Sequence, residues 1–303
     1  MSLTDEQLVA RRGYIGGSDI AAILGLDPFK SSFAVWLAKH EGYEQPRSEQ
    51  LEAEADRGVH LEAGVLEWYG EREQRPVRRN AETFRSETLP IFGCTPDGFS
   101  LAPGAGAVSL VYGGAVTRLV SVKCPRRGDD WGEQFSDQFP LRHQLQLQWE
   151  HFVLESKGYN LDTTLDLAAL IYGELRVFRV ERNYEVQAKL AGFAGRWWQR
   201  HMVEGIPPSV DERPETSQYL RRQYQQRAEK SREATLEESG MLVELKEAEA
   251  VLDDAHKRHD VAKHRVMAAI GEDAGLFSRG LGEVTWRANK NNMRTFRTNW
   301  RKR

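Results

Sequence analysis

Two stretches decide the fold: IFGCTPDGF at residues 91–99 and LVSVKCP at residues 119–125. Both have the apolar and β-branched content of strands, with turn residues at their borders. Asp97 lies in a turn after the first strand and Lys123 lies on the next, so the two side chains can meet at one end of a sheet. There a carboxylate can hold a divalent cation, and a lysine can orient a water or stabilise developing phosphate charge. A plain β-turn aspartate and an edge lysine would leave the same pattern.

Helical periodicity flanks these strands on both sides. Apolar residues recur at helical spacing between residues 3 and 37, around a glycine turn (GYIGGSD, 13–19) in which Ser18 or Asp19 is expected to cap a helix starting at Ile20. Further helices are expected over 49–72, after Pro140 and over 183–203. Strand-like pieces occupy 83–89, 91–95, 119–123, 164–172 and 174–180, with a hairpin or loop at 103–114. This order predicts an α/β (α+β) domain with a central mixed sheet flanked by helices.

The composition changes after about residue 205. Residues 206–240 are rich in Pro, Gln, Arg and Glu, which predicts a polar linker or a solvent-facing helix. From Leu242 to Ile270, apolar or alanine positions recur mostly every three or four residues, which predicts a helical arm. The last segment, VTWRANKNNMRTFRTNWRKR, carries seven Lys or Arg residues and no acid. It is expected to form a two-stranded basic ribbon or a flexible tail, so the predicted divisions are 1–205, 206–240 and 241–303.

The composition bounds the class of protein. With 303 residues, 40% hydrophobic and 29% charged, the chain is expected to be globular, with room for one large domain and an appendage. No apolar run approaches the length of about 20 residues that a membrane helix needs, so a cytoplasmic protein without membrane contact is expected. Two cysteines, Cys94 and Cys124, are expected to be reduced core thiols. The net charge of -3 does not indicate a nucleic-acid binder, yet the basic, aromatic tail has the composition of either a nucleic-acid contact or a solubilising tail.

Six short blocks follow one another between residues 11 and 155. They are Arg11 with Ile15-Gly16-Gly17-Ser18-Asp19-Ile20, Pro28-Phe29-Lys30-Ser31, Arg57-Gly58-Val59-His60-Leu61-Glu62, Thr95-Pro96-Asp97-Gly98, Val122-Lys123-Cys124-Pro125 and Gln144-Leu145-Gln146. In this order they resemble the YqaJ-like viral recombinases and phage lambda-type alkaline exonucleases of the PD-(D/E)xK nuclease superfamily. The resemblance implies a restriction-endonuclease-like core. It also implies a metal-dependent 5′-to-3′ exodeoxyribonuclease that acts on the ends of linear double-stranded DNA in phage-type recombination by single-strand annealing.

The resemblance assigns the catalytic roles residue by residue. Glu62, Asp97 and the backbone carbonyl of Val122 are similar to the ligands of Mg²⁺ or Mn²⁺ in this family. Lys123 resembles the residue that positions the attacking water. Gln144 resembles the helix glutamine that lines the same site.

The resemblance also implies what the protein binds. Arg11 and Ser18 are similar to the pair that holds the terminal 5′-phosphate of the duplex, a role suited to guanidinium donors. Because a phosphate pocket implies a terminus, this pair argues against an endonuclease that acts inside the duplex. Family members work with a single-strand annealing protein and can form ring-shaped homotrimers, so both are expected partners, in a bacterial host cytoplasm if the gene is phage-borne.

Ser121 departs from the family pattern, which has Asp or Glu two residues before the lysine. A hydroxyl is neutral and a poor ligand for a hard dication, so the site lacks about one unit of negative charge. Three explanations stay open: an inactivating substitution, a naturally inactive DNA-end-binding or scaffold protein, or an acid supplied from elsewhere. Glu150 shares a helix face with Gln146 at i,i+4 spacing and is a candidate for that acid, or else a solvent-facing helix residue.

Overall fold

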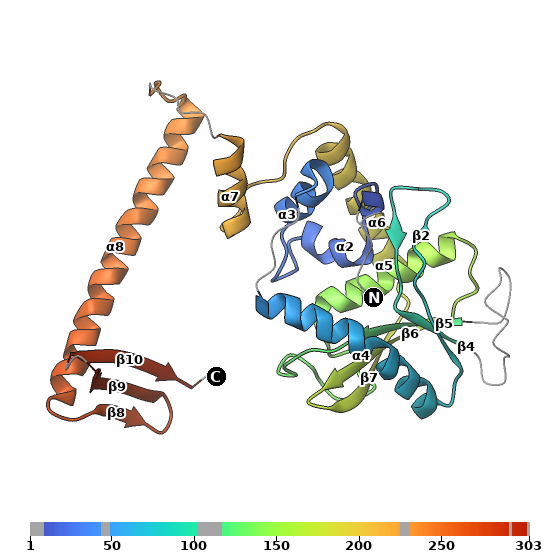
Figure 1. Ribbon diagram of the computed structural model, residues 1–303. Helices are drawn as coiled ribbons and strands as arrows, with labels where there is room; N and C mark the ends of the chain where they lie inside the picture. The colour runs from blue at the N-terminus through green and yellow to red at the C-terminus, as the bar shows by residue number, and fades with distance from the viewer. Residues whose placement is uncertain (1–8, 44–48, 102–116, 225–230, 291–292, 302–303) are drawn as a thin grey trace. The chain divides into compact units, whose positions relative to one another are not determined.

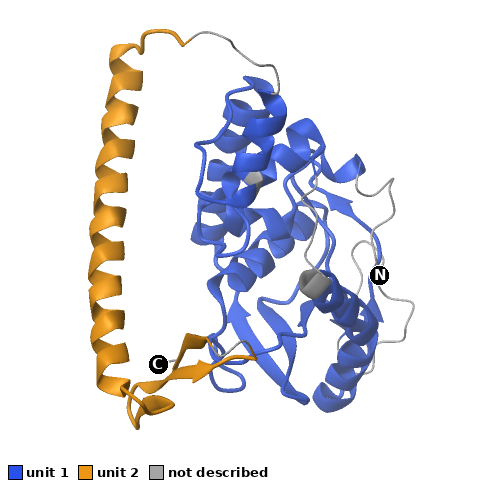
Figure 2. Cartoon of the chain, turned by 60° about the vertical axis from the view of Figure 1, so that its left-hand side comes forward, with its two compact units in different colours: residues 1–225 blue, residues 226–303 orange. Residues whose placement is uncertain are grey.

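The computed structural model describes residues 9–43, 49–101, 117–224, 231–290 and 293–301. The helix expected from Leu3 and the hairpin or loop expected over 103–114 lie outside these ranges. The chain divides into two compact units, Met1–Gln225 and Gln226–Arg303 (Figure 2). No helix among the described residues is long and apolar enough to cross a membrane.

A five-stranded mixed sheet with the order β1-β4-β5-β6-β7 lies at the centre of the first unit (Figure 1). Its strands are β1 (Val77–Arg79), β4 (Gly98–Leu101), β5 (Thr117–Lys123), β6 (Thr164–Ile171) and β7 (Glu174–Glu181). Only β5 and β6 are parallel, and the connection between them contains α5 (Leu141–Ser156). The predicted α/β class with a central mixed sheet is therefore confirmed.

The strands around the turn at Asp97 differ from the prediction. The expected strands over 83–89 and 91–95 shorten to a separate pair, β2 (Phe84–Arg85) and β3 (Gly93–Cys94). The strand that pairs with β5 is β4, which begins after Asp97 and places Gly98 opposite Val120. Asp97 therefore precedes a central strand and comes beside Ser121.

One face of the sheet is covered by α4 (Glu49–Glu73). Its Leu66 and Tyr69 pack in one cluster with Val120 and Val122 of β5. The Tyr69 hydroxyl also donates a hydrogen bond of 2.6 Å to Asp166, a fully buried carboxylate on β6. These contacts fix the helix that carries Glu62.

The opposite face is covered by helices from three parts of the chain. They are α2 (Gly17–Ile23), α3 (Ser32–Trp36) with the π-helical turn η1 (Leu37–Glu41), α5, and α6 (Tyr184–Trp198) with the π-helical turn η2 (Gln199–Val203). Their core cluster includes Leu119 of β5. Since successive side chains of a strand point to opposite faces, Ser121 and Lys123 share the face of Leu119, on which α5 packs.

Two local expectations need correction. Helix α2 begins at Gly17 with Gly16 as its N-cap, so neither Ser18 nor Asp19 caps a helix starting at Ile20. Asp19 instead accepts a hydrogen bond of 3.1 Å from the Gly16 backbone N–H, which puts its carboxylate in the buried first turn. Both cysteines are free, but only Cys94 lies in the core; Cys124 is half-buried, so the expectation of two core thiols is wrong for Cys124.

Beyond α6, helix α7 (Pro214–Gln223) lies within the polar segment, and the second unit contains one long helix and a small sheet. The helix, α8 (Leu236–Ile270), confirms the expected arm and starts with a capping box between Thr235 and Glu238. The expected two-stranded ribbon is an antiparallel sheet of three strands: β8 (Gly275–Ser278), β9 (Gly282–Ala288) and β10 (Arg294–Trp300). Among the described residues of this unit, only Ile270 and Val284 are buried apolar side chains.

Candidate functional site

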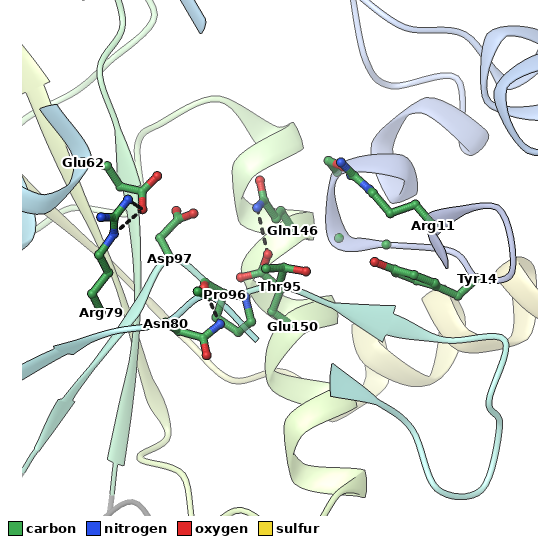
Figure 3. A pocket seen from close by; sticks show the side chains of 14 residues that line it. Arg11, Tyr14, Glu62, Arg79, Asn80, Thr95, Pro96, Asp97, Gln146 and Glu150 are labelled. Carbon is green, nitrogen blue, oxygen red and sulfur yellow. Dashed lines mark hydrogen bonds and ion pairs between the residues drawn. The ribbon is translucent and has the colours of Figure 1, made fainter. Parts of the chain in front are cut away.

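A pocket of about 420 Å³ lies between α4, α5, α2 and the loop before β4. Four of the residues expected at the site line it: Arg11, Ser18, Glu62 and Asp97. Gln146 and Glu150 of α5 line it as well. In Figure 3, Glu62 and Arg11 lie on opposite sides of the view, with Asp97 and the two α5 side chains between them. Segments far apart in the sequence thus meet in one cavity.

Asp97 is the most strongly bonded acid of the pocket. Its Oδ2 accepts hydrogen bonds from the Ser121 hydroxyl at 2.9 Å and from the Val122 backbone N–H at 2.8 Å. The Lys123 Nζ lies 3.3 Å from the same oxygen. The structure therefore brings Asp97 and Lys123 together as expected, because the pairing of β4 with β5 sets them side by side.

Ser121 is the position at which the resemblance leads us to expect an acid. Its side chain is buried, and its hydroxyl donates to Asp97. A carboxylate here would face Asp97 directly and would need a cation between the two. The serine instead stabilises the Asp97 carboxylate by a hydrogen bond, without a cation. The site then has one negative charge fewer than it would have with an acid at position 121.

Glu62 is held by an arginine from the neighbouring strand. The Arg79 guanidinium of β1 approaches the Glu62 carboxylate at 3.1 Å through both Nε and Nη2 (Figure 3). This partner was not predicted, since it depends on packing α4 over β1.

Gln144 was expected to line the site, but it does not line this pocket. The Gln144 side chain turns away and donates to the backbone carbonyls of Asp137 and Phe139 at 2.9 and 2.8 Å, and it is not among the residues that line the pocket. Gln146 lines the pocket in its place. Two positions along a helix are about 200° apart around its axis, so only one of the pair can face the sheet edge.

Glu150 is buried in the wall of the pocket. Its Oε1 accepts a hydrogen bond of 2.8 Å from Gln146 Nε2, whereas its Oε2 is buried with no hydrogen-bond partner in the described part of the chain. Burial raises the pKa of Glu150 to about 8, and the nearby Asp97 carboxylate adds to the effect. The residue is only 2% exposed, so the solvent-facing interpretation of Glu150 is wrong.

Arg11 and Ser18 form the opposite side of the pocket. Arg11 Nη2 donates to the Ser18 hydroxyl at 2.9 Å. The segment from Arg11 to Tyr14 is fixed by two cations: Lys39 donates to the Arg11 and Tyr14 carbonyls, and Arg85 stacks 4.1 Å from the Tyr14 ring centre. Together these contacts present an exposed hydroxyl and a guanidinium to the cavity.

A buried ion cluster anchors this side to α2. Asp19 lies 2.8 Å from Lys30 and 2.9 Å from Lys39, and the Asp19 and Lys39 side chains are 4% and 5% exposed. Burial by itself would raise the pKa of Asp19, but Lys30 and Lys39 outweigh it and hold that pKa well below its usual range. Lys39 therefore ties α2 and the Arg11 loop to one carboxylate.

The donor set can be compared with the needs of a divalent cation. Mg²⁺ and Mn²⁺ prefer oxygen ligands, and this pocket contains three carboxylates, from Glu62, Asp97 and Glu150. The unpartnered Oε2 of Glu150 is an oxygen of the required kind. Within the described ranges, however, no three His, Cys, Asp or Glu side chains lie close enough together to hold an ion as they stand. The chemistry of the donors fits, while Arg79 occupies the Glu62 carboxylate.

Two comparisons with known proteins give the same family name. A family model described as the YqaJ-like viral recombinase domain matches residues 6–157. The uncharacterized protein YqaJ of Bacillus subtilis is 26% identical over 224 residues, which cover 73% of this chain and 63% of that protein. This chain thus spans less than two thirds of the length of that relative.

Solved structures of exonucleases are also similar to this chain. An alkaline exonuclease from Laribacter hongkongensis, LHK-Exo in complex with dAMP, has 17% identity and a TM-score of 0.48, and the match covers 73% of this chain and 97% of that one. A phage-related exonuclease from Haemophilus somnus 129PT has 11% identity and a TM-score of 0.41, with 63% of this chain and 96% of that one covered.

Proposed function

Because the chain belongs to the YqaJ-like viral recombinase family, we propose that it is a divalent-metal-dependent exodeoxyribonuclease acting on the ends of linear double-stranded DNA. The proposed polarity is 5′ to 3′, which leaves a single strand for annealing. The observation that carries the proposal is the meeting of Glu62 and Asp97 with Arg11 and Ser18 around one cavity, with Lys123 paired to Asp97. Acids for a metal ion and donors for a terminal phosphate are the two parts that such a reaction needs.

The residues of the pocket divide into two proposed roles. Glu62, Asp97 and the Val122 carbonyl would hold Mg²⁺ or Mn²⁺, which supplies Lewis-acid stabilisation of the phosphodiester when bound. Lys123 Nζ orients the attacking water from its place beside Asp97.

The other side of the pocket binds the terminus. Arg11 and Ser18 are proposed to bind the terminal 5′-phosphate, Arg11 through its guanidinium donors and Ser18 through its hydroxyl. Tyr14, which lies between them in the sequence and also lines the pocket, packs under the Arg85 guanidinium.

Digestion of end-labelled DNA tests this function. The protein is incubated with 5′-phosphorylated linear duplex in Mg²⁺, in Mn²⁺ and in EDTA, with closed circular duplex as the control. Loss of the 5′-ended strand from linear DNA alone, and only with metal, is the expected result. Cleavage of the circle would indicate an endonuclease, and cleavage in EDTA would contradict the metal requirement.

A non-catalytic DNA-end-binding or scaffold protein is the second candidate. It is favoured by Ser121, whose hydroxyl satisfies Asp97 without a metal ion. This alternative predicts salt-sensitive binding to duplex ends with no turnover in either metal. The digestion experiment separates the two, since only the first predicts product.

The family also motivates proposals about assembly. We propose a homotrimer and an annealing protein as partner, with the host cytoplasm as the site of action. Light scattering of the purified chain tests the trimer. Co-purification with a single-strand annealing protein from the same gene neighbourhood tests the partner.

A further inference from the structure

Burying one carboxylate oxygen of Glu150 without a hydrogen bond costs folding free energy, and a purely structural role does not explain that cost. One of its carboxylate oxygens is buried and lacks a hydrogen-bond partner within the described ranges, and the residue is 2% exposed. Buried polar groups in folded proteins are nearly always paired, so an unpaired one calls for an explanation. A metal ion or an ordered ligand at the site is one of the few explanations that remove the cost.

The position of Glu150 points to the missing acid. Ser121 lies on the face of the sheet that α5 covers, and Glu150 of α5 lines the same pocket as Asp97 and Glu62. Strand β5 has Ser121 in place of the expected carboxylate, whereas Glu150 of the covering helix α5 supplies a carboxylate. The number of carboxylates in the pocket is thereby restored to three.

Gly17, which has no side chain, leaves room for the Glu150 side chain. A Cβ atom on Gly17 would lie 2.9 Å from Glu150 Oε1 and 3.1 Å from Gln146 Cγ. Any residue other than glycine at this position would push both α5 side chains. The glycine turn that presents Ser18 to the pocket therefore also makes space for Glu150.

We propose that Glu150 is a metal-binding residue that takes the place of the carboxylate absent at position 121, with Gln146 holding its other oxygen in position. The proposal rests on the proposed nuclease function for the identity of the ion, Mg²⁺ or Mn²⁺. Glu150 acts as a ligand through Oε2, and Gln146 acts as a positioning residue through its 2.8 Å hydrogen bond to Oε1.

Binding of Mn²⁺ alone tests the assignment without any DNA. Free Mn²⁺ is measured by electron paramagnetic resonance during titration of the full chain and of Glu150→Gln, Asp97→Asn and Glu155→Gln. Glu155 is a matched control, because it lies on the same helix but pairs with Arg182 outside the pocket. Glu150→Gln and Asp97→Asn are expected to weaken Mn²⁺ binding by about tenfold or more, and Glu155→Gln to leave it unchanged.

Two further variants guard against a misfolded protein. Glu150→Asp keeps the negative charge, but its side chain is shorter by one methylene. This variant is expected to bind Mn²⁺ more weakly than the parent and to have a similar melting temperature. Adding Ser121→Glu to Glu150→Gln is expected to recover Mn²⁺ affinity. Equal Mn²⁺ binding by the parent and by Glu150→Gln, or no Mn²⁺ binding by the parent at millimolar concentration, would overturn the proposal.

Digestion of linear duplex by the same proteins separates this proposal from the proposed function. If Glu150→Gln loses Mn²⁺ and no protein cuts DNA, the ligand assignment stands and the nuclease function fails. If the parent and Glu150→Gln cut DNA equally well and bind Mn²⁺ equally well, the nuclease function stands and the ligand assignment fails.

Discussion

At the scale of residues, the side chain at position 121 decides the charge of the site around Asp97. The Ser121 hydroxyl, the Val122 N–H and the Lys123 ammonium all converge on one Asp97 oxygen. An acid in place of Ser121 would turn this cluster of donors into a pair of carboxylates that needs a cation. The residue at 121 therefore sets the charge of the pocket, and Lys123 is the single cation beside Asp97 among these three groups.

Replacing Lys123 with alanine is expected to lower cleavage of linear duplex DNA by about 10²- to 10⁴-fold, the usual contribution of a group that handles the attacking water. DNA binding should persist, because Arg11 and Ser18 remain. Single-turnover digestion and fluorescence anisotropy measure the two properties. Lys189→Ala, on the exposed face of α6, is the control. Undiminished cleavage by Lys123→Ala would remove Lys123 from the active site.

Gly17→Ala is expected to weaken Mn²⁺ binding and to destabilise the protein by roughly 1 to 3 kcal/mol, because the added methyl group meets the buried Glu150 carboxylate. Gly64→Ala is the control: it is also a helical glycine, and its added methyl would meet nothing within 4 Å. That control should be neutral or slightly stabilising. Chemical denaturation and Mn²⁺ titration provide the readouts, and a Gly17→Ala protein with parental values in both would show that the space is not required.

At the scale of elements, α2 depends on the contact of its first turn with η1. Lys39 of η1 reaches Asp19 in α2 and the carbonyls of Arg11 and Tyr14 in the preceding loop. The side of the pocket that carries Arg11 and Ser18 is thus assembled around one buried ion pair. Removing one partner of a buried pair leaves the other charge without compensation, which costs roughly 3 to 5 kcal/mol.

Asp19→Asn is therefore expected to lower the free energy of unfolding at neutral pH, with a deficit that shrinks in acid. Because the folded-state pKa of Asp19 lies below its ordinary value of 3.8, the ionised carboxylate stabilises the fold fully above that pH, and the contribution is lost as the pH falls further. Urea denaturation of both proteins between pH 7 and pH 2 measures the difference. A deficit that stays constant over this range would contradict the role of the ionised group.

At the scale of the whole molecule, the two units differ in what stabilises them. Both large hydrophobic clusters lie within the first unit, whereas the described part of the second unit buries few apolar side chains. The second unit carries the basic strand β10, with Arg294 and Arg297, and the aromatic Trp300. This composition suits contact with phosphates and bases.

A protein truncated after Gln225 is expected to unfold cooperatively, like the full chain, and to bind linear duplex DNA more weakly with a shallower salt dependence. Each lost phosphate contact should reduce the slope of log K against log salt by about one unit. Thermal melts and anisotropy titrations at several salt concentrations measure these properties. An unchanged slope would show that residues 226–303 make no ionic contact with DNA.

The sequence by itself determined the class of the fold, the order of the main helices and strands, and the acids and lysine expected at the site. These follow from local periodicity and from short motifs, which need no knowledge of distant contacts. Only the tertiary structure decided which side chains meet. Gln146 replaces Gln144 because the rotation of α5 depends on how the helix packs. Arg79 binds Glu62 because α4 lies over β1, and Glu150 is buried beside Asp97 because a helix and a strand far apart in sequence cover each other. Packing between helices and strands decides whether a polar side chain faces solvent or another residue. The local sequence pattern does not contain that information.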